Sequence, residues 1–195
     1  RYGMSETIIN TSNPLQGDRI AGTVGFALPG QRVRVADEAG VPVPAGEVGM
    51  IEVAGPNVFQ GYWRMPEKTA EEIRADGFFI TGDLGVQAAD GRLSIVGRSK
   101  DLVISGGYNV YPKEVEVALD DMPQVSESAV IGVLHPDFGE AVVAVIVPVA
   151  DEVTQVQVDA ALGDQLARFK QPKCVMNVTE LPRNTMGKVQ KNVLR

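Results

Sequence analysis

The stretch Gly97–Glu116 constrains the fold of this chain more than any other, because signals for charge, strand, turn and helix follow one another directly. A charged segment at positions 98–101 precedes a short β-type run and a Ser105-Gly106-Gly107 turn. Pro112 marks the start of a helix, since proline at the first helical position removes no intrahelical hydrogen bond. This succession indicates both a functional site and a boundary between domains.

The residues before this stretch, from 20 to 97, read as β structure. Arg32–Val35 alternates as a half-buried strand does, and Met50–Val53 is a second strand. A short polar helix is expected around Pro66–Arg74, and Trp63 is expected to be a core aromatic residue. Turn signals recur roughly every 8–12 residues, which favours a small barrel or a bent sheet.

The residues after it alternate between helix and strand. Strands are expected at Ser128–Val133, Ala141–Val149 and Cys174–Val178, and helices at 112–121 and about 155–169. The predicted fold class is therefore α+β. It combines a β-rich, distorted barrel-like subdomain with a small α/β domain that has a short sheet and flanking helices.

Composition excludes several classes of protein. The net charge of −7 argues against a non-specific nucleic-acid binder and against a polybasic membrane anchor. Cys174 is the only cysteine, so no internal disulfide forms and no Cys/His cluster offers a zinc site. No signal peptide and no apolar run of membrane-spanning length is present, and a cytoplasmic location is expected.

Three short stretches contain candidate phosphate- or sugar-binding groups. Ser5 and Glu6 could hold a phosphate and a Mg²⁺, which prefers oxygen ligands, or Ser5 could simply cap a helix. Asp83 follows an apolar strand and could bind ribose hydroxyls, or could be a turn aspartate. Lys188 follows Gly187 on a polar loop and could reach a phosphate, or could be a solvated surface lysine.

These stretches together resemble the adenylate-forming superfamily, which includes acyl-CoA synthetases, luciferase and the adenylation domains of peptide synthetases. Four motifs occur in family order across nearly the whole chain: YGMSE, TGD, GRSKDLVISGGYNVYPKEVE and LPRNTMGKVQK. The tail and the runs GPNVFQGYWRMPEKT and GFFITGDLG are similar to those of malonyl-CoA synthetases.

The resemblance implies specific roles, position by position. Tyr2 would stack on adenine, Gly3 would border the acyl pocket, Ser5 would contact the α-phosphate, and Glu6 would bind Mg²⁺. Asp83 and Arg98 would hold the ribose hydroxyls of ATP or AMP, and Lys188 would be the lysine needed for adenylation. Lys100 would be a hinge, and Ser105, Gly106 and Gly107 would line the path of CoA.

The implied function is an AMP-forming acid–CoA ligase, with malonate or another short acid as substrate. Residues 1–97 would be the end of a large N-terminal adenylation domain, and 98–195 a mobile C-terminal lid. The chain is thus expected to be an inactive C-terminal fragment. Two alternatives stay open, a domain that loads a carrier protein and a non-catalytic binding or regulatory fragment. A protein acetyltransferase acting on Lys188 is a further expected partner.

Overall fold

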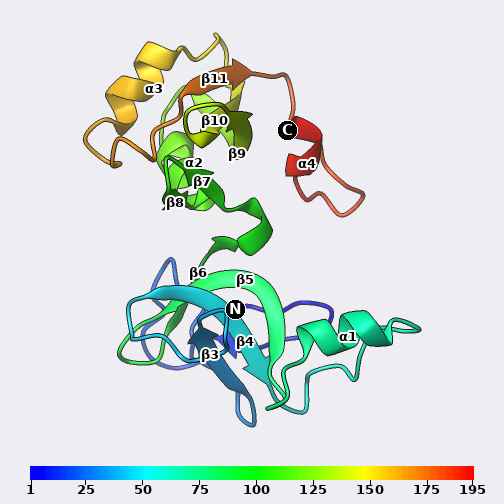
Figure 1. The fold of residues 1–195 in the computed structure, drawn as a ribbon. Helices are drawn as coiled ribbons and strands as arrows, with labels where there is room; N and C mark the ends of the chain where they lie inside the picture. Colours follow the sequence, from blue (N-terminus) through cyan, green and yellow to red (C-terminus); the bar gives the residue numbers. More distant parts are fainter. The chain divides into compact units, whose positions relative to one another are not determined.

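The computed structural model describes residues 1–195, which divide into two compact units, Arg1–Ser99 and Lys100–Arg195. Strands far outnumber helices, which confirms the predicted α+β class (Figure 1). The strands are β1 (Thr11–Ser12), β2 (Phe26–Ala27), β3 (Arg32–Ala36), β4 (Val48–Ala54), β5 (Phe79–Gln87), β6 (Leu93–Arg98), β7 (Val103–Ser105), β8 (Tyr108–Val110), β9 (Val125–His135), β10 (Gly139–Pro148) and β11 (Cys174–Asn177). The helices are α1 (Pro66–Glu72), α2 (Pro112–Asp120), α3 (Gln155–Leu162), α4 (Lys191–Leu194) and the 3₁₀ turn η1 (Ser99–Asp101). None of these helices is long and apolar enough to cross a membrane.

The first unit is built on an antiparallel meander of four strands in the order β3-β4-β5-β6, beside the small β1-β2 pair. The sheet is open, so the bent-sheet alternative holds and no closed barrel forms. Its core is apolar and consists of Tyr2, Val35, Ile51, Val53 and Leu93. Val35, Ile51 and Val53 come from the two neighbouring strands β3 and β4, as the alternation of apolar residues in those strands predicts.

Strand β5 differs from the sequence prediction, which ended it at Thr81-Gly82-Asp83. The strand instead continues to Gln87. Gly82 has a φ of 73°, which only glycine adopts without strain, and the register of β5 with β4 shifts in the same region. Glycine thus accommodates an irregularity inside the strand, and Asp83 lies in the middle of a strand, not in a turn.

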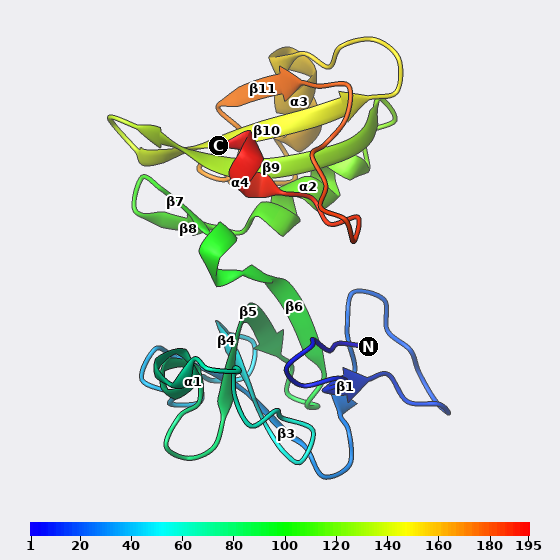
Figure 2. The ribbon, with the colours of Figure 1, turned by 90° about the vertical axis from the view of Figure 1, so that its right-hand side faces the viewer.

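The second unit has a five-stranded sheet in which β9 and β10 form a long antiparallel hairpin and β11 pairs parallel to β10 (Figure 2). Alternate residues of β10 face opposite sides, as a period of two requires. Val142, Ala144 and Ile146 pack against α2 and α3, whereas Val143 and Val145 pack with Leu181 and the C-terminal residues. The sheet is therefore covered on both faces.

The helices of the second unit follow local sequence signals. Pro112 is at the start of α2 as predicted, and the predicted apolar face of this helix is buried. Thr154 and Gln157 form a capping box at the start of α3. This helix ends at Leu162, earlier than the predicted 169, because Gly163 follows and glycine is a poor helix former.

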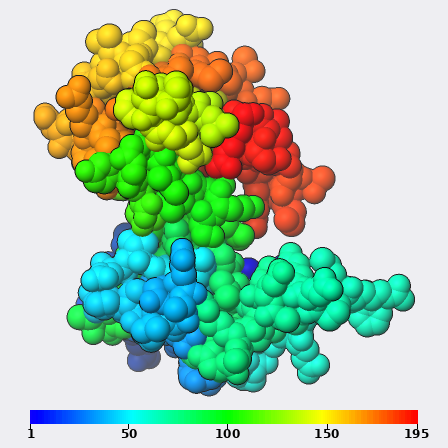
Figure 3. Space-filling model, viewed as in Figure 1, coloured from blue at the N-terminus to red at the C-terminus, as the bar shows by residue number.

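The segment around α1 stands out from the rest of its unit in the space-filling view (Figure 3). Trp63, which precedes α1, is 85% exposed, so the prediction of a core aromatic residue is wrong. Its neighbour Arg64 has a φ of 57° and places its guanidinium 5.7 Å from the indole ring. An isolated aromatic residue carries no periodic signal, so its burial could not be predicted from the sequence.

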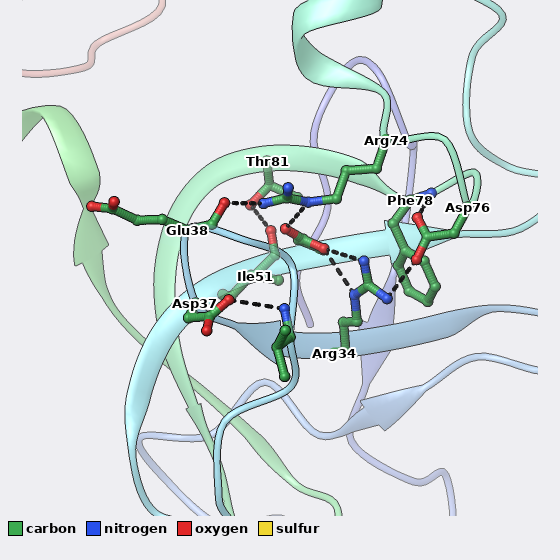
Figure 4. Close-up of polar contacts among 10 residues, drawn as sticks. Arg34, Asp37, Glu38, Ile51, Arg74, Asp76, Phe78 and Thr81 are labelled. Atoms are coloured by element: carbon green, nitrogen blue, oxygen red, sulfur yellow. Dashed lines mark hydrogen bonds and ion pairs between the residues drawn. The ribbon is translucent and has the colours of Figure 1, made fainter.

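The carboxylate of Glu52 on β4 is buried in the first unit and pairs with Arg34 and Arg74, both of which are labelled in Figure 4. Its Oε2 atom accepts from Arg34 Nη2 at 2.7 Å, and its Oε1 atom accepts from Arg74 Nε at 2.6 Å. Arg34 also pairs with Asp76 at 2.7 Å and lies 3.8 Å above the Phe78 ring. Burial opposes the charge of Arg34, but its hydrogen bonds to Glu52 and Asp76 outweigh this and raise its pKa. The network joins β3, β4 and the segment between α1 and β5.

The exposed end of this network predicts a pH dependence of stability. The hydrogen bond from Arg34 lowers the pKa of Asp76 below its usual value. A lowered carboxyl pKa stabilises the folded state above the unfolded pKa of about 3.9, and this contribution is lost as pH falls through the folded pKa. We expect the unfolding free energy to fall below about pH 4 less steeply in Asp76→Asn than in the original protein, as measured by urea denaturation at each pH. Equal slopes would contradict this.

Candidate active site

A cross-strand ion pair joins the two residues predicted to bind ribose. Asp83 on β5 lies directly opposite Arg98 on β6, and Arg98 Nε contacts Asp83 Oδ1 at 2.8 Å. Asp83 is nearly buried, whereas the Arg98 side chain is 44% exposed. Thr81 supports the aspartate, because its hydroxyl accepts from the backbone N–H of Asp83 at 3.1 Å and donates to Ile51. The carboxylate is thus fixed by backbone and side-chain contacts, with a cation beside it.

Tyr2 joins the same constellation. Its hydroxyl donates to Asp83 Oδ2 at 2.5 Å, and its ring is buried against the core of the first unit. Burial and, next, the hydrogen bond to Asp83 raise the pKa of Tyr2 well above its usual value, so it stays protonated at neutral pH. The structure therefore brings Tyr2, Asp83 and Arg98 together from positions far apart in the sequence.

The loop that follows Tyr2 closes on itself, since the backbone N–H groups of Asn10 and Thr11 donate to the Tyr2 carbonyl. Gly3 is essential to this closure, because a Cβ at this position would lie 1.9 Å from the Ile8 carbonyl oxygen. Ile8 itself adopts a φ of 57°, a costly conformation for a β-branched residue. Such strain persists only where the surrounding structure imposes it, and it is typical of functional loops.

Ser5 and Glu6 lie on this loop, and no helix begins there. The alternative in which Ser5 caps a helix is therefore wrong. Ser5 is exposed, and Glu6 is half-buried. The one side-chain contact of the Glu6 carboxylate is with the Tyr62 hydroxyl at 3.2 Å, so most of its lone pairs can accept further ligands. A single such carboxylate fits Mg²⁺, which binds proteins through one or two carboxylates together with substrate phosphates.

Lys188 lies in a tight hairpin between Arg183 and Val189 in the second unit. Asn184 shapes the hairpin, because its side-chain oxygen accepts from the backbone N–H groups of Met186 and Lys188 at 3.0 and 2.9 Å. Gly187 has a φ of 78°, which the turn requires. The Lys188 side chain is exposed, so its ammonium group can contact a ligand.

Both ends of this hairpin are fixed to the rest of the second unit. The Nη2 atom of Arg183 donates to both carboxylate oxygens of Glu127 on β9, at 2.8 Å each. Lys191 contacts Oε1 of the nearly buried Glu116 at 2.5 Å, and the same oxygen accepts from the backbone N–H of Val130. Neither anchoring carboxylate has a local sequence signal, because each meets its partner across 56 or 75 positions.

The predicted Ser105-Gly106-Gly107 turn joins β7 to β8. Gly106 and Gly107 have φ values of 59° and 81°, which is the conformation of a two-residue type I′ hairpin. Beside it is an open cavity of about 580 Å³. Its lining is largely apolar and aromatic with two cations: Ser105, Gly106, Tyr108, Phe138, Arg168, Phe169 and Lys173. The Tyr108 and Phe169 rings stack 4.6 Å apart.

Sequence reasoning did not predict this aromatic cavity, because its walls come from three separate segments of the second unit. Lys100 is exposed within η1, at the start of the same unit. The predicted site residues thus fall into two groups, one in each unit. Tyr2, Gly3, Ser5, Glu6, Asp83 and Arg98 belong to the first unit, and Lys100, Ser105, Gly106, Gly107 and Lys188 to the second. No group of three or more His, Cys, Asp and Glu side chains arranged to hold a metal is found in the structure.

Comparison with known families places both units in one enzyme class. Residues 1–63 match the AMP-binding enzyme family, and residues 114–188 match the AMP-binding enzyme C-terminal domain. The chain belongs to the AMP-binding enzyme family. The resemblance to adenylate-forming enzymes that the four motifs indicated is thereby confirmed.

The relatives of this AMP-binding chain include acid–CoA ligases. It is 41% identical over 197 residues to an indoleacetate–CoA ligase of Aromatoleum aromaticum and 40% identical over 207 residues to a malonate–CoA ligase of Arabidopsis thaliana. Both alignments include 100% of the chain, and 38% and 34% of the respective relatives. ATP-bound MatB from Rhodopseudomonas palustris is 62% identical, with a TM-score of 0.95 over 100% of the chain and 39% of that protein. The AMP-binding chain therefore spans less than two fifths of the length of these relatives.

Proposed function

We propose that this chain is the C-terminal part of an ATP-dependent acid–CoA ligase. The enzyme forms an acyl-AMP and pyrophosphate from an acid and ATP, and then an acyl-CoA and AMP. The observation that carries the proposal is the Tyr2–Asp83–Arg98 constellation, in which a fixed carboxylate and a cation can receive the two hydroxyls of a ribose. The matches to AMP-binding enzymes and acid–CoA ligases support it.

The two units are proposed to correspond to two domains of the enzyme with different roles. Residues 1–97 belong to the large adenylation domain, and residues 98–195 are the mobile lid with its hinge at Lys100. The two compact units meet at Ser99 and Lys100, within one short 3₁₀ turn, which supports this division to within two residues and keeps Arg98, at the end of β6, with the first unit. A hinge needs only a few residues whose backbone angles can change, and η1 provides them.

In the first half-reaction, a carboxylate oxygen of the acid attacks the α-phosphorus of ATP and pyrophosphate leaves. Ser5 contacts the α-phosphate, Tyr2 borders the adenine, and Gly3 borders the acid. Glu6 would hold Mg²⁺, which supplies positive charge to the phosphates when bound. The Lys188 ammonium group contributes a second positive charge, because both reactants are anions and negative charge develops in the transition state.

In the second half-reaction, the CoA thiol attacks the acyl carbon and AMP leaves. Ser105, Gly106 and Gly107 border the path of the thiol arm, since glycines allow close backbone approach. The adjoining cavity suits the remainder of CoA: the stacked Tyr108 and Phe169 rings offer apolar surface, and Arg168 and Lys173 offer positive charge. Lys188 would obstruct this step, so the lid moves between the two.

We propose malonate or another short acid as the substrate, on the basis of the malonate–CoA ligase relative and the malonyl-CoA synthetase-like motifs. Relatives that act on indoleacetate and on malonate match this chain at 41% and 40% identity. Overall identity therefore does not distinguish the two acids, and the proposal of malonate rests on the malonyl-CoA synthetase-like motifs.

The decisive experiment measures AMP release from ATP and CoA with malonate, methylmalonate, acetate, a medium-chain fatty acid and a cinnamate. It uses the full-length protein that contains this chain, and the chain alone. We expect malonate-dependent AMP and acyl-CoA formation by the full-length protein and none by the chain. Preference for another acid would retain the ligase and discard malonate. Thioester formation on a carrier protein but not on CoA would replace the ligase proposal with carrier loading.

We further propose a cytoplasmic enzyme whose Lys188 is a substrate for a protein acetyltransferase. The exposure of Lys188 at the tip of an ordered hairpin supports this, because the ammonium group is accessible to another protein. Acetylation would remove the positive charge needed for adenylation. Mass spectrometry of the native protein tests it, and consistently unmodified Lys188 would discard it.

A further inference from the structure

The segment Asn57–Tyr62 holds the backbone of the loop that carries Glu6. The backbone N–H of Phe59 donates to the Glu6 carbonyl at 2.8 Å. The side-chain amide of Asn57 donates to the Thr7 carbonyl at 2.7 Å and to the Asn10 side chain at 3.2 Å. The loop is therefore attached to this segment at Glu6 and at two residues that follow it, which restricts the main chain at Glu6.

The same segment also contacts the Glu6 side chain. The Tyr62 hydroxyl lies 2.6 Å from Glu72 Oε2 and 3.2 Å from Glu6 Oε1, so one hydroxyl bridges two carboxylates. A hydroxyl has a single proton, and ionised carboxylates only accept. The short contact has the length of a strong O–H···O⁻ bond, and the longer contact to Glu6 is the weaker arm of a three-centre hydrogen bond that shares the same proton.

The Tyr62 ring is itself held from several sides. It packs edge-on against Phe59, with ring centroids 4.8 Å apart, and Phe59 packs edge-on against Phe79 of β5 at 5.4 Å. The Tyr62 backbone N–H donates to the Thr69 hydroxyl of α1 at 2.9 Å, and the Lys68 ammonium lies 4.7 Å from the ring. A ring fixed in this way can position a neighbouring group without moving itself.

We propose that Tyr62 is a positioning residue for Glu6: its hydroxyl, anchored on Glu72, holds the Glu6 carboxylate where it meets the Mg²⁺ of bound MgATP. The inference rests on the proposed function, because it assigns Glu6 to that ion. Glu72 has a supporting role. It orients the hydroxyl and competes with Glu6 for the single proton.

The test compares binding of MgATP with binding of ATP in excess EDTA by calorimetry, using the full-length protein and its Tyr62→Phe variant. Loss of this long, shared hydrogen bond is expected to weaken MgATP binding about 3- to 10-fold, less than the loss of an unshared bond to a charged group. Binding of metal-free ATP is expected to stay unchanged, because Tyr62 acts only through Glu6. The magnesium concentration that gives half-maximal AMP release is expected to rise by a similar factor.

Two further variants test whether the effect is specific to the Tyr62 hydroxyl and to its contact with Glu6. Tyr111→Phe removes a hydroxyl in the second unit that makes no hydrogen bond within the structure, and it should change neither affinity. Glu72→Gln keeps an oxygen beside Tyr62 but removes the competing charge, so MgATP binding should be retained or strengthened. Equal weakening of MgATP and metal-free ATP in Tyr62→Phe would indicate a general structural role and overturn the inference, as would unchanged MgATP binding. Absence of ATP binding by the original protein would instead overturn the proposed function.

Discussion

Replacing Lys188 by alanine is expected to reduce acid-dependent AMP release by the full-length protein about 100- to 1000-fold, the usual cost of removing one preorganised group that stabilises developing charge. The loss should be in kcat and in kcat/KM for ATP alike, because the ammonium contributes mainly in the transition state. Conversion of chemically supplied acyl-AMP and CoA to acyl-CoA should remain within about 3-fold of the original rate, since Lys188 has no role in that step. Pyrophosphate release and thioester formation, measured separately, check both statements.

Lys113→Ala is the matched control, because Lys113 is another exposed lysine of the second unit and has no assigned role. Its activity should equal that of the original protein. Lys188→Arg keeps the positive charge but places it on a larger planar group, so it should restore only part of the activity. Adenylation by Lys188→Ala at more than a third of the original rate would remove Lys188 from the mechanism.

Replacing Glu52 by alanine is expected to destabilise the first unit by about 3 kcal/mol. Removing one partner of a buried ion pair typically costs about 3–5 kcal/mol, because the remaining charge is left without compensation. The lower end applies here, since the side chains of Arg34 and Arg74 are 16% and 22% exposed and can reach water. Hydrogen exchange by mass spectrometry, followed in peptides from β4 and β5, measures the change.

Peptides from β9 and β10 provide an internal control, because these strands belong to the other unit and should exchange as before. Glu52→Gln should lie between the original protein and the alanine variant, as it keeps hydrogen-bond acceptance but removes the charge. Asp76→Asn removes the exposed end of the same network and should raise exchange at neutral pH by much less than Glu52→Ala does, because exposed ion pairs contribute little. Unaltered exchange in β4 and β5 of Glu52→Ala would show that the network does not stabilise the sheet.

Local signals in the sequence predicted much of the second unit. Pro112 placed the start of α2, and the apolar runs at 128–133 and 141–149 placed the central hairpin, because proline geometry and buried strands depend on nearby residues. The end of α3 was less predictable. Gly163 disfavours helix, but the apolar periodicity continues through Leu166, so the two signals conflict at that point.

Features that depend on contacts between residues far apart in the chain could not be predicted from the sequence. Glu52 reads as an ordinary acidic residue in a strand, yet it is fully buried because Arg34 and Arg74 approach it from other segments. Asp83 was singled out as a candidate from its place after an apolar strand, but that predicted place was wrong, since Gly82 lets β5 continue past it. The Tyr62 contact with Glu6 spans 56 positions and has no local signature.

The two anchors of the Lys188 hairpin limit how this lysine can move. With Arg183 held by Glu127 and Lys191 held by Glu116, the hairpin cannot swing on its own, and the ammonium group explores only the volume that its flexible side chain reaches. Little loop entropy is then lost when the lysine meets an anion. Larger displacements require the sheet of the second unit to travel with it. Under the proposed mechanism, delivery and withdrawal of the charge would therefore be coupled to the motion of an entire folded body.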